Sequence, residues 1–118
     1  LKNLKVWGTG NPKREFLYVD DLADALIHLM KFYSDEIQIN VGTGEDMSIR
    51  EAAELMCEVV GFKGELEFDK SMPDGSPRKL LNVDRLKELG WTAKTSLEKG
   101  LQETYKWYLQ SQITQNKN

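Results

Sequence analysis

Trp7 and Arg14 are the first residues in the chain whose types and spacing could serve a ligand. Trp7 ends a short apolar run, a turn rich in glycine and proline follows, and Arg14 opens the next apolar run. A planar guanidinium binds paired phosphate oxygens, and an indole packs against a flat base. The pair therefore fits a nucleotide, although two residue types do not identify one.

Both residues also have ordinary structural explanations. On the residues alone, a salt bridge from Arg14 to Glu15 or Asp21 is the commoner role, and Trp7 is more often a core residue. Residue type alone therefore assigns neither residue to a ligand.

A second group of polar residues lies in the loop at 73–77 and just after it. Asp74, in a Pro-Asp-Gly turn, can accept hydrogen bonds from ribose or base donors, or it can serve the turn alone. Arg78 and Lys79 add positive charge beside this loop, and both phosphate binding and solvated surface charge fit them. The candidate binding residues are therefore Trp7, Arg14, Asp74, Arg78 and Lys79.

Hydrophobic periodicity predicts a small α/β domain with a few short strands and three or four helices. Apolar residues at helical spacing from Leu22 to Phe32 predict a helix with one face toward a core, and Asp20 or Asp21 is its expected N-cap. Strands are expected near Trp7, after Arg14, at 37–41 and at 65–69, with a short helix at 84–89.

Two capping boxes predict the starts of longer helices. Ser48 and Glu51 open one that ends at Gly61, and Thr95 and Glu98 open the last one. Beyond Gln110 the sequence is polar and is expected to fray. The chain thus divides into a domain of residues 1–110 and a polar tail of residues 111–118.

Composition restricts the function classes. The chain has 118 residues and a formal net charge of -3, which weighs against nucleic acid binding. No apolar run reaches the roughly 20 residues that span a bilayer. The single cysteine, Cys57, fits a reducing, cytoplasmic compartment, and the single histidine, His28, has no partner at metal-ligand spacing. We therefore expect no nucleic acid, membrane or metal partner.

Four sequence segments carry a resemblance to a known family. They are WGTG followed by PKREF, the VDD before the first helix, INVGTGEDMSIRE from 39 to 51, and PDGSPRKLL. From about residue 6 to 109 the chain resembles the C-terminal, substrate-binding part of the GDP-L-fucose synthases, within the extended short-chain dehydrogenase/reductase family. Related nucleotide-sugar enzymes share features of the first segment, so PDGSPRKLL favours the fucose synthases. The chain departs from the usual family pattern at Tyr18 and Asn82, where histidine and aspartate are common.

The resemblance implies a function and roles for two residues. Arg14 would bind the substrate, and Trp7 would form a wall of the nucleotide-sugar pocket. The parent enzyme would convert GDP-4-keto-6-deoxy-D-mannose to GDP-L-fucose, by epimerisation at C3 and C5 and NADPH-dependent reduction at C4. The family also implies a homodimeric parent whose subunit contacts lie mainly in the cofactor domain.

The chain lacks the features of that cofactor domain. Neither of its two Gly-Thr-Gly sequences completes the G-x-G-x-x-G dinucleotide motif, and no tyrosine has a lysine four residues later. We therefore expect the Rossmann half, the NADPH site and the catalytic residues to lie outside this chain. The chain alone would bind no cofactor and would be inactive.

Two alternative functions remain open at this point. One is the corresponding domain of a UDP- or dTDP-sugar epimerase or dehydratase. The other is a non-enzymatic interaction module, which rests on Trp91, Trp107 and Tyr108 as either core or contact residues.

Overall fold

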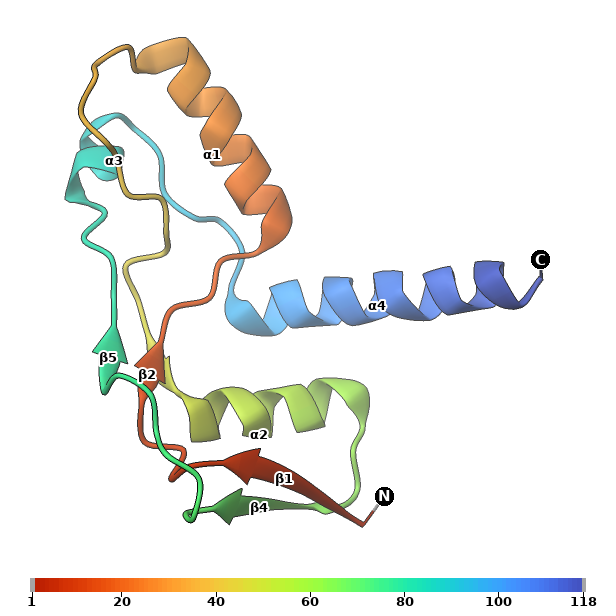
Figure 1. Ribbon diagram of the computed structural model, residues 1–118. Helices are drawn as coiled ribbons and strands as arrows, with labels where there is room; N and C mark the ends of the chain where they lie inside the picture. Colours follow the sequence, from red (N-terminus) through yellow and green to blue (C-terminus); the bar gives the residue numbers. More distant parts are fainter. Residues whose placement is uncertain (1, 118) are drawn as a thin grey trace.

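The computed structural model describes residues 2–117 and shows the small α/β architecture that the sequence predicts (Figure 1). Short strands and four helices alternate along the described residues. In chain order they are β1 (Asn3–Trp7), β2 (Lys13–Arg14), α1 (Val19–Phe32), β3 (Met47–Ser48), α2 (Ile49–Val60), β4 (Glu65–Asp69), β5 (Arg78–Lys79), α3 (Asp84–Glu88) and α4 (Leu97–Asn116).

Two small sheets organise the strands. β1 pairs with β4 in parallel, from Asn3 opposite Glu65 to Trp7 opposite Asp69, and α2 lies over this pair (Figure 1). The second sheet has the order β3-β2-β5, with β2 antiparallel to β3 and parallel to β5. β2 is therefore the central strand of the sheet that carries Arg14.

The core joins α1 to the segment around α3. Its buried hydrophobic residues are Ala25, Val83, Leu86 and Trp91. The Trp91 indole Nε1 donates to Asp24 Oδ2 at 2.9 Å, which satisfies its polar group within the core. Burial with a hydrogen bond makes Trp91 a structural residue, so it no longer supports the interaction-module alternative.

α1 starts at Val19, and its expected carboxylate cap is wrong. The cap residue is Tyr18, which makes no side-chain cap hydrogen bond. The buried Asp21 carboxylate instead accepts from Thr95 N at 2.9 Å and from Thr95 Oγ1 at 3.1 Å. The Asp21 carboxylate therefore connects α1 to the segment before α4 and provides a hydrogen-bond acceptor for the Thr95 N–H group.

The apolar face expected on α1 is buried only in part. Ala25 is fully buried and Leu29 packs on the core, but Leu22, Leu26 and Phe32 are exposed. The apolar stripe of the helix is therefore wider than the core that packs against it, and Ile27 and Met30 are exposed as well.

The strand expected at 37–41 is wrong, because the structure has no strand there. Apolar residues alone do not make a strand, which needs a neighbour for its backbone hydrogen bonds. Ile39 and Val41 pack against the core without such a neighbour.

The capping box at Ser48 is confirmed, and the one at Thr95 is not. Ser48 caps α2 with Glu51 in the reciprocal arrangement, and the helix ends at Gly61 with φ of 72°. α4 is capped one residue later than expected, by Ser96, whose side chain accepts from Lys99 N. Thr95 is engaged by Asp21 instead.

α4 continues to Asn116, beyond the point where the sequence was expected to fray. Residues 111–116 contain no glycine or proline to stop the helix. The helix packs near its start, where Gly100 is buried, and then extends away from the rest of the molecule (Figure 1). Trp107 and Tyr108 are exposed on this extension.

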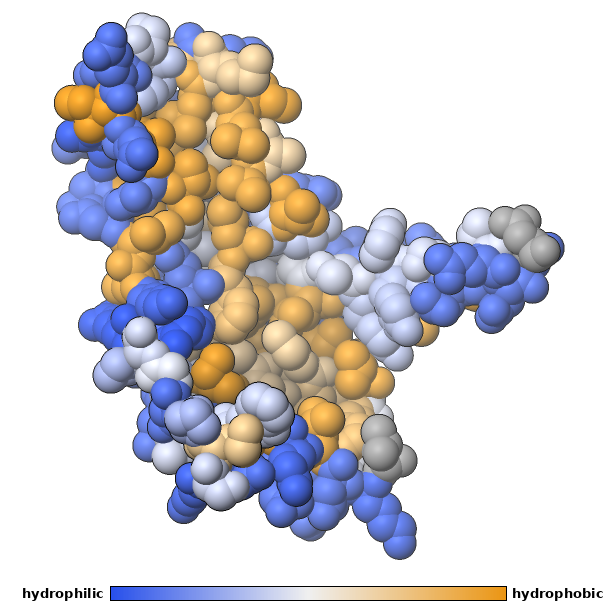
Figure 2. All heavy atoms as spheres, in the orientation of Figure 1, coloured by the Kyte–Doolittle hydropathy of each residue, from blue (hydrophilic) through white to orange (hydrophobic). Residues whose placement is uncertain are grey.

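The chain is more open than a compact domain of its size. Its radius of gyration is 17.4 Å, whereas about 13.5 Å is expected for a compact domain of this length. Its accessible surface is 8843 Å², against about 6,600 Å² expected from its mass. Figure 2 shows hydrophobic residues gathered in a band from α1 toward α2 on the face in view. Much apolar surface is thus uncovered in the chain by itself.

Candidate functional site

Arg14 carries a positive charge that no carboxylate neutralises within the described residues. Its Nη1 donates to the main-chain oxygens of Lys13 and Ser76, both at 2.7 Å. The ion pairs found within residues 2–117 involve other residues. The salt bridge to Glu15 or Asp21, favoured from the residues alone, is therefore wrong. The guanidinium also connects β2 to the loop at 73–77.

Lys79 lies directly across from Arg14 in the pairing of β2 with β5. Paired residues of neighbouring strands project from the same face of a sheet, so this face carries two cations side by side. Like charges in this position are unfavourable unless an anion lies between them. Lys79 is exposed, and it too has no ion-pair partner within residues 2–117.

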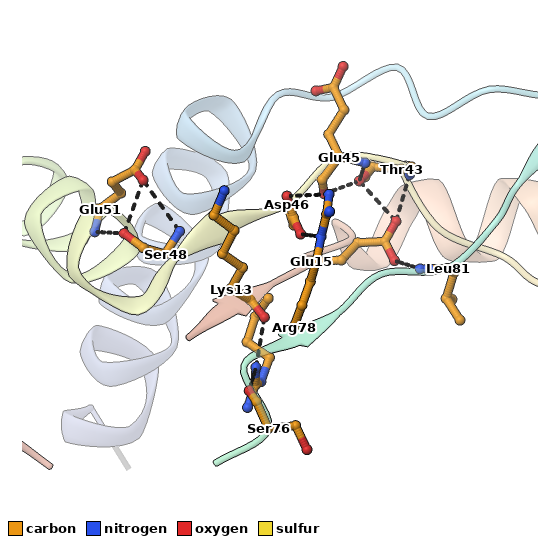
Figure 3. A network of polar contacts seen from close by, with 12 residues as sticks. Lys13, Glu15, Thr43, Glu45, Asp46, Ser48, Glu51, Ser76, Arg78 and Leu81 are labelled. Carbon is orange, nitrogen blue, oxygen red and sulfur yellow. Dashed lines mark hydrogen bonds and ion pairs between the residues drawn. The ribbon is translucent and has the colours of Figure 1, made fainter. Parts of the chain in front are cut away.

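Arg78, unlike Lys79, forms an ion pair within the chain. Its Nε lies 2.6 Å from Oδ2 of Asp46, whose side chain is only 9% exposed. Figure 3 shows the guanidinium extended along the Asp46 carboxylate. The charge of Arg78 is therefore already balanced within the chain, which leaves it less free for a ligand phosphate than Arg14 or Lys79.

Glu15 joins three segments that are distant in sequence. Its Oε2 accepts from Gly44 N at 2.6 Å and from Thr43 Oγ1 at 3.2 Å, and its Oε1 accepts from Leu81 N at 3.2 Å (Figure 3). Gly42 passes so close that an added Cβ would lie 2.7 Å from Oε2. The sequence alone predicts no role for Glu15 beyond a salt bridge, because its three partners are distant from it in the chain.

Asp74 connects the loop at 73–77 to the turn after β1. Its Oδ1 accepts from Thr9 N at 2.8 Å, and its Oδ2 accepts from Thr9 Oγ1 at 2.7 Å. The Thr9 hydroxyl and then the Thr9 amide stabilise the charged form and lower the pKa of Asp74. Asp74 therefore has a structural role, which is to hold the loop against Thr9. Its binding of a ribose or base stays a prediction.

Trp7 lies at the end of β1 with its side chain exposed. The residue is 68% exposed, so the core role that its type alone favoured is wrong. After β1, Gly8 N donates a hydrogen bond to Asp69 O at 2.9 Å, and Thr9 N donates one to Asp74. The Trp7 turn and the loop at 73–77 are therefore fixed to one another, with the indole free to contact a ligand.

A cavity beside β2 includes only one of the five candidate residues, Arg14. This cavity of about 250 Å³ is lined by three segments, around Arg14, around Asp46 and before α4. Phe16, Thr43 and Lys94 are among its lining residues, and they are not among the five candidates predicted from the sequence. Only the folded chain brings these segments together, although Thr43 lies in a motif that was already noted for its resemblance.

The described residues show neither a metal site nor a membrane-spanning helix. Within 2–117 there is no cluster of three or more histidine, cysteine or acidic side chains able to hold a metal ion. His28 contacts Leu89 O through Nε2 at 2.7 Å, and its ring lies 4.7 Å from that of Phe32. In the same part of the chain, no helix is long and apolar enough to cross a membrane.

Comparison with known proteins now identifies the relatives of this chain. Residues 1–42 match the model of the NAD dependent epimerase/dehydratase family. The chain is 55% identical over 112 residues to "Probable GDP-L-fucose synthase 1" of Oryza sativa subsp. japonica, covering 95% of this chain and 34% of the relative. It is 53% identical over 116 residues to the GDP-L-fucose synthase of Escherichia coli K12, covering 91% of this chain and 36% of the relative.

This chain is a homologue of one segment of the GDP-L-fucose synthases. It spans about one third of the length of the curated relatives that it matches. Its structure agrees, with a TM-score of 0.88 and 31% identity to a GDP-L-fucose synthetase from Naegleria fowleri bound to NADP, over 95% of this chain and 36% of that one. The fold is consistent with a C-terminal segment of an extended short-chain dehydrogenase/reductase, as the sequence resemblance implied.

Proposed function

We propose that this chain is the GDP-sugar-binding segment of a GDP-L-fucose synthase. The parent enzyme would convert GDP-4-keto-6-deoxy-D-mannose to GDP-L-fucose, by epimerisation at C3 and C5 and reduction at C4 with NADPH. The proposal rests on the homology and on one structural observation above all. Arg14 and Lys79 are cross-strand neighbours of like charge, with no carboxylate between them in the described residues.

A pyrophosphate is the ligand group that best suits this pair. It brings about two negative charges, and a guanidinium can hold two of its oxygens in parallel, with a lysine as a second point charge. Ser76 O orients the Arg14 guanidinium from one side. Binding the pyrophosphate would therefore relieve the repulsion between the two cations.

The remaining candidate residues take supporting positions in this proposal. Trp7 would pack its exposed indole against the nucleotide-sugar. Asp74 would hold the loop that presents Ser76 and could accept a further hydrogen bond from ribose or base. Arg78, balanced by Asp46, would contribute mainly through the shape of β5.

The open shape of the chain supports a missing partner domain. A surface about a third larger than that of a compact domain, together with the exposed apolar residues of α1, fits a chain that packs against more protein. We infer that the partner is the NADPH-binding Rossmann half of the same enzyme, which would also hold the catalytic residues and the dimer contacts. The free thiol of Cys57 fits a cytoplasmic enzyme.

Substitution of Arg14 in the full-length enzyme tests the proposal. Arg14→Met keeps much of the aliphatic stem and removes the fork, so charge-assisted hydrogen bonds of roughly 1.5 to 3 kcal/mol are lost and GDP-sugar affinity falls about ten- to a hundredfold. Arg14→Lys recovers only part of the loss, because a point charge cannot make a bidentate contact. NADPH affinity stays unchanged. Both dissociation constants are measured by calorimetry.

Arg85→Met is the matched control, because it removes an exposed arginine of α3. Circular dichroism establishes that each variant is folded. Wild-type GDP-sugar affinity in folded Arg14→Met would contradict the proposed pocket. A parent enzyme that prefers UDP- or dTDP-sugars over GDP-sugars would instead support the alternative substrate class.

A further inference from the structure

Glu15 is a half-buried carboxylate without a cationic partner in the described residues. Three donors satisfy it instead, two of them backbone N–H groups, from the loop at 42–44 and from the segment after β5. A carboxylate held in this way forms charge-assisted hydrogen bonds, which are about twice as strong as neutral ones. Glu15 therefore restrains both segments relative to β2.

One of the two restrained segments directly follows the strand that carries Lys79. Leu81, whose N–H Glu15 accepts, lies two residues after Lys79, and Glu15 itself follows Arg14 directly. The ladder between β2 and β5 contains only two residue pairs, Lys13 with Arg78 and Arg14 with Lys79. The Glu15 carboxylate continues the connection between the strands where the backbone pairing stops.

The geometry points to Glu15 as a positioning residue that sets the separation of Arg14 and Lys79 for a diphosphate. This inference rests on the proposed function and assigns to it a residue that does not touch the ligand. Without the Glu15 contact to Leu81, two like charges on a two-pair ladder would move apart. With it, the cation pair is held together before any anion arrives, so less ordering is needed on binding.

The test uses the full-length enzyme and its product GDP-L-fucose as the probe. Glu15→Gln keeps the length of the side chain but places an amide N–H against a backbone N–H, so one of the two segments is released. The GDP-L-fucose dissociation constant should rise about three- to tenfold, less than in Arg14→Met, because Glu15 acts on the ligand only through the placement of the two cations. The NADPH dissociation constant should not change. Glu54→Gln, at an exposed position of α2, is the control.

A double-mutant cycle separates positioning from a general structural role. If Glu15 acts through Lys79, the loss in Glu15→Gln combined with Lys79→Met should be clearly smaller than the sum of the two single losses. Additive losses, or an equal loss of NADPH affinity, would overturn the inference. Should Glu15→Gln fail to fold, Glu15→Asp retains the charge but cannot reach both segments, and it carries the same expectations.

The outcomes also distinguish the inference from the proposed function. If wild type binds GDP-L-fucose and Arg14→Met weakens that binding, but folded Glu15→Gln binds as wild type does, only the role of Glu15 is wrong. A folded wild-type enzyme that does not bind GDP-L-fucose overturns both.

Discussion

Asp74 and Thr9 are joined by two hydrogen bonds across 65 residues of sequence, one from the Thr9 amide and one from its hydroxyl. The carboxylate thereby fastens the loop at 73–77 onto the turn that follows Trp7. Both donors favour the ionised carboxylate, and they lower its pKa below the usual value of an aspartate. The connection therefore depends on pH.

Acidification should weaken this connection. A carboxylate whose pKa is lower in the folded state contributes stability above its unfolded pKa, and that contribution is lost as the pH falls through the folded pKa. Wild type should thus be more stable than Asp74→Asn at pH 6, and the difference should shrink below about pH 4. Urea unfolding of the full-length enzyme at several pH values measures it. A difference that is constant from pH 6 to 3 would speak against the ionised connection.

Gly8→Ala should disrupt the same connection sterically. Gly8 has φ of 90°, and an added methyl would overlap Oδ1 of Asp74. Gly61 provides the matched control, with φ of 72° and no atom within 4 Å of an added Cβ. Each substitution carries a backbone cost of about 1 to 2 kcal/mol, and Gly8→Ala should cost clearly more. Equal shifts of the unfolding midpoint would mean that the loop yields without loss.

Ser48→Ala should destabilise the protein without affecting ligands. Ser48 Oγ accepts from Glu51 N at 3.1 Å at the start of α2, and loss of such a cap costs about 0.5 to 2 kcal/mol. Denaturant unfolding of the full-length enzyme gives the change, with Ser34→Ala in the exposed loop after α1 as the control. An unchanged free energy of unfolding would show that the cap contributes little.

The 118-residue chain alone should not bind NADPH above background. A dinucleotide needs a glycine-rich turn whose N–H groups approach the pyrophosphate, and neither Gly-Thr-Gly sequence completes it. Calorimetric titration of the chain, with circular dichroism to establish folding and the full-length enzyme as the positive control, measures this. Saturable binding in the low micromolar range by the folded chain would contradict the prediction.

Sequence patterns predicted correctly the helix start and the helix end that depend on neighbouring residues. The Ser48 box and the stop at Gly61 depend on residues within a few positions of each other, and the structure has both. The strand at 65–69 was also predicted correctly, and it has the neighbour that it needs in β1. The strand at 37–41 failed because its apolar pattern does not reveal whether a neighbouring strand exists. The caps predicted at Asp21 and Thr95 were wrong for a related reason. These two residues bind each other across 74 residues of sequence instead of capping their own helices.

The site was predictable in its residue types but not in its pairings. Motif and charge selected Arg14 and Lys79, and only the β2–β5 register shows that they face each other. Sequence also could not show that Asp46 balances Arg78 while Arg14 has no carboxylate partner in the described residues. Such differences depend on contacts between residues that are distant in the chain.

The three tryptophans occupy environments that differ enough to act as separate optical reporters. Trp91 is 4% exposed in the core, whereas Trp7 and Trp107 are 68% and 67% exposed. Buried indoles emit at shorter wavelengths than hydrated ones, so the blue part of the emission follows the α1–α3 core. A nucleotide stacking on Trp7 would quench only the red part. Comparison with Trp107→Phe would then isolate the Trp7 signal, so ligand binding and unfolding can be followed in one unlabelled sample.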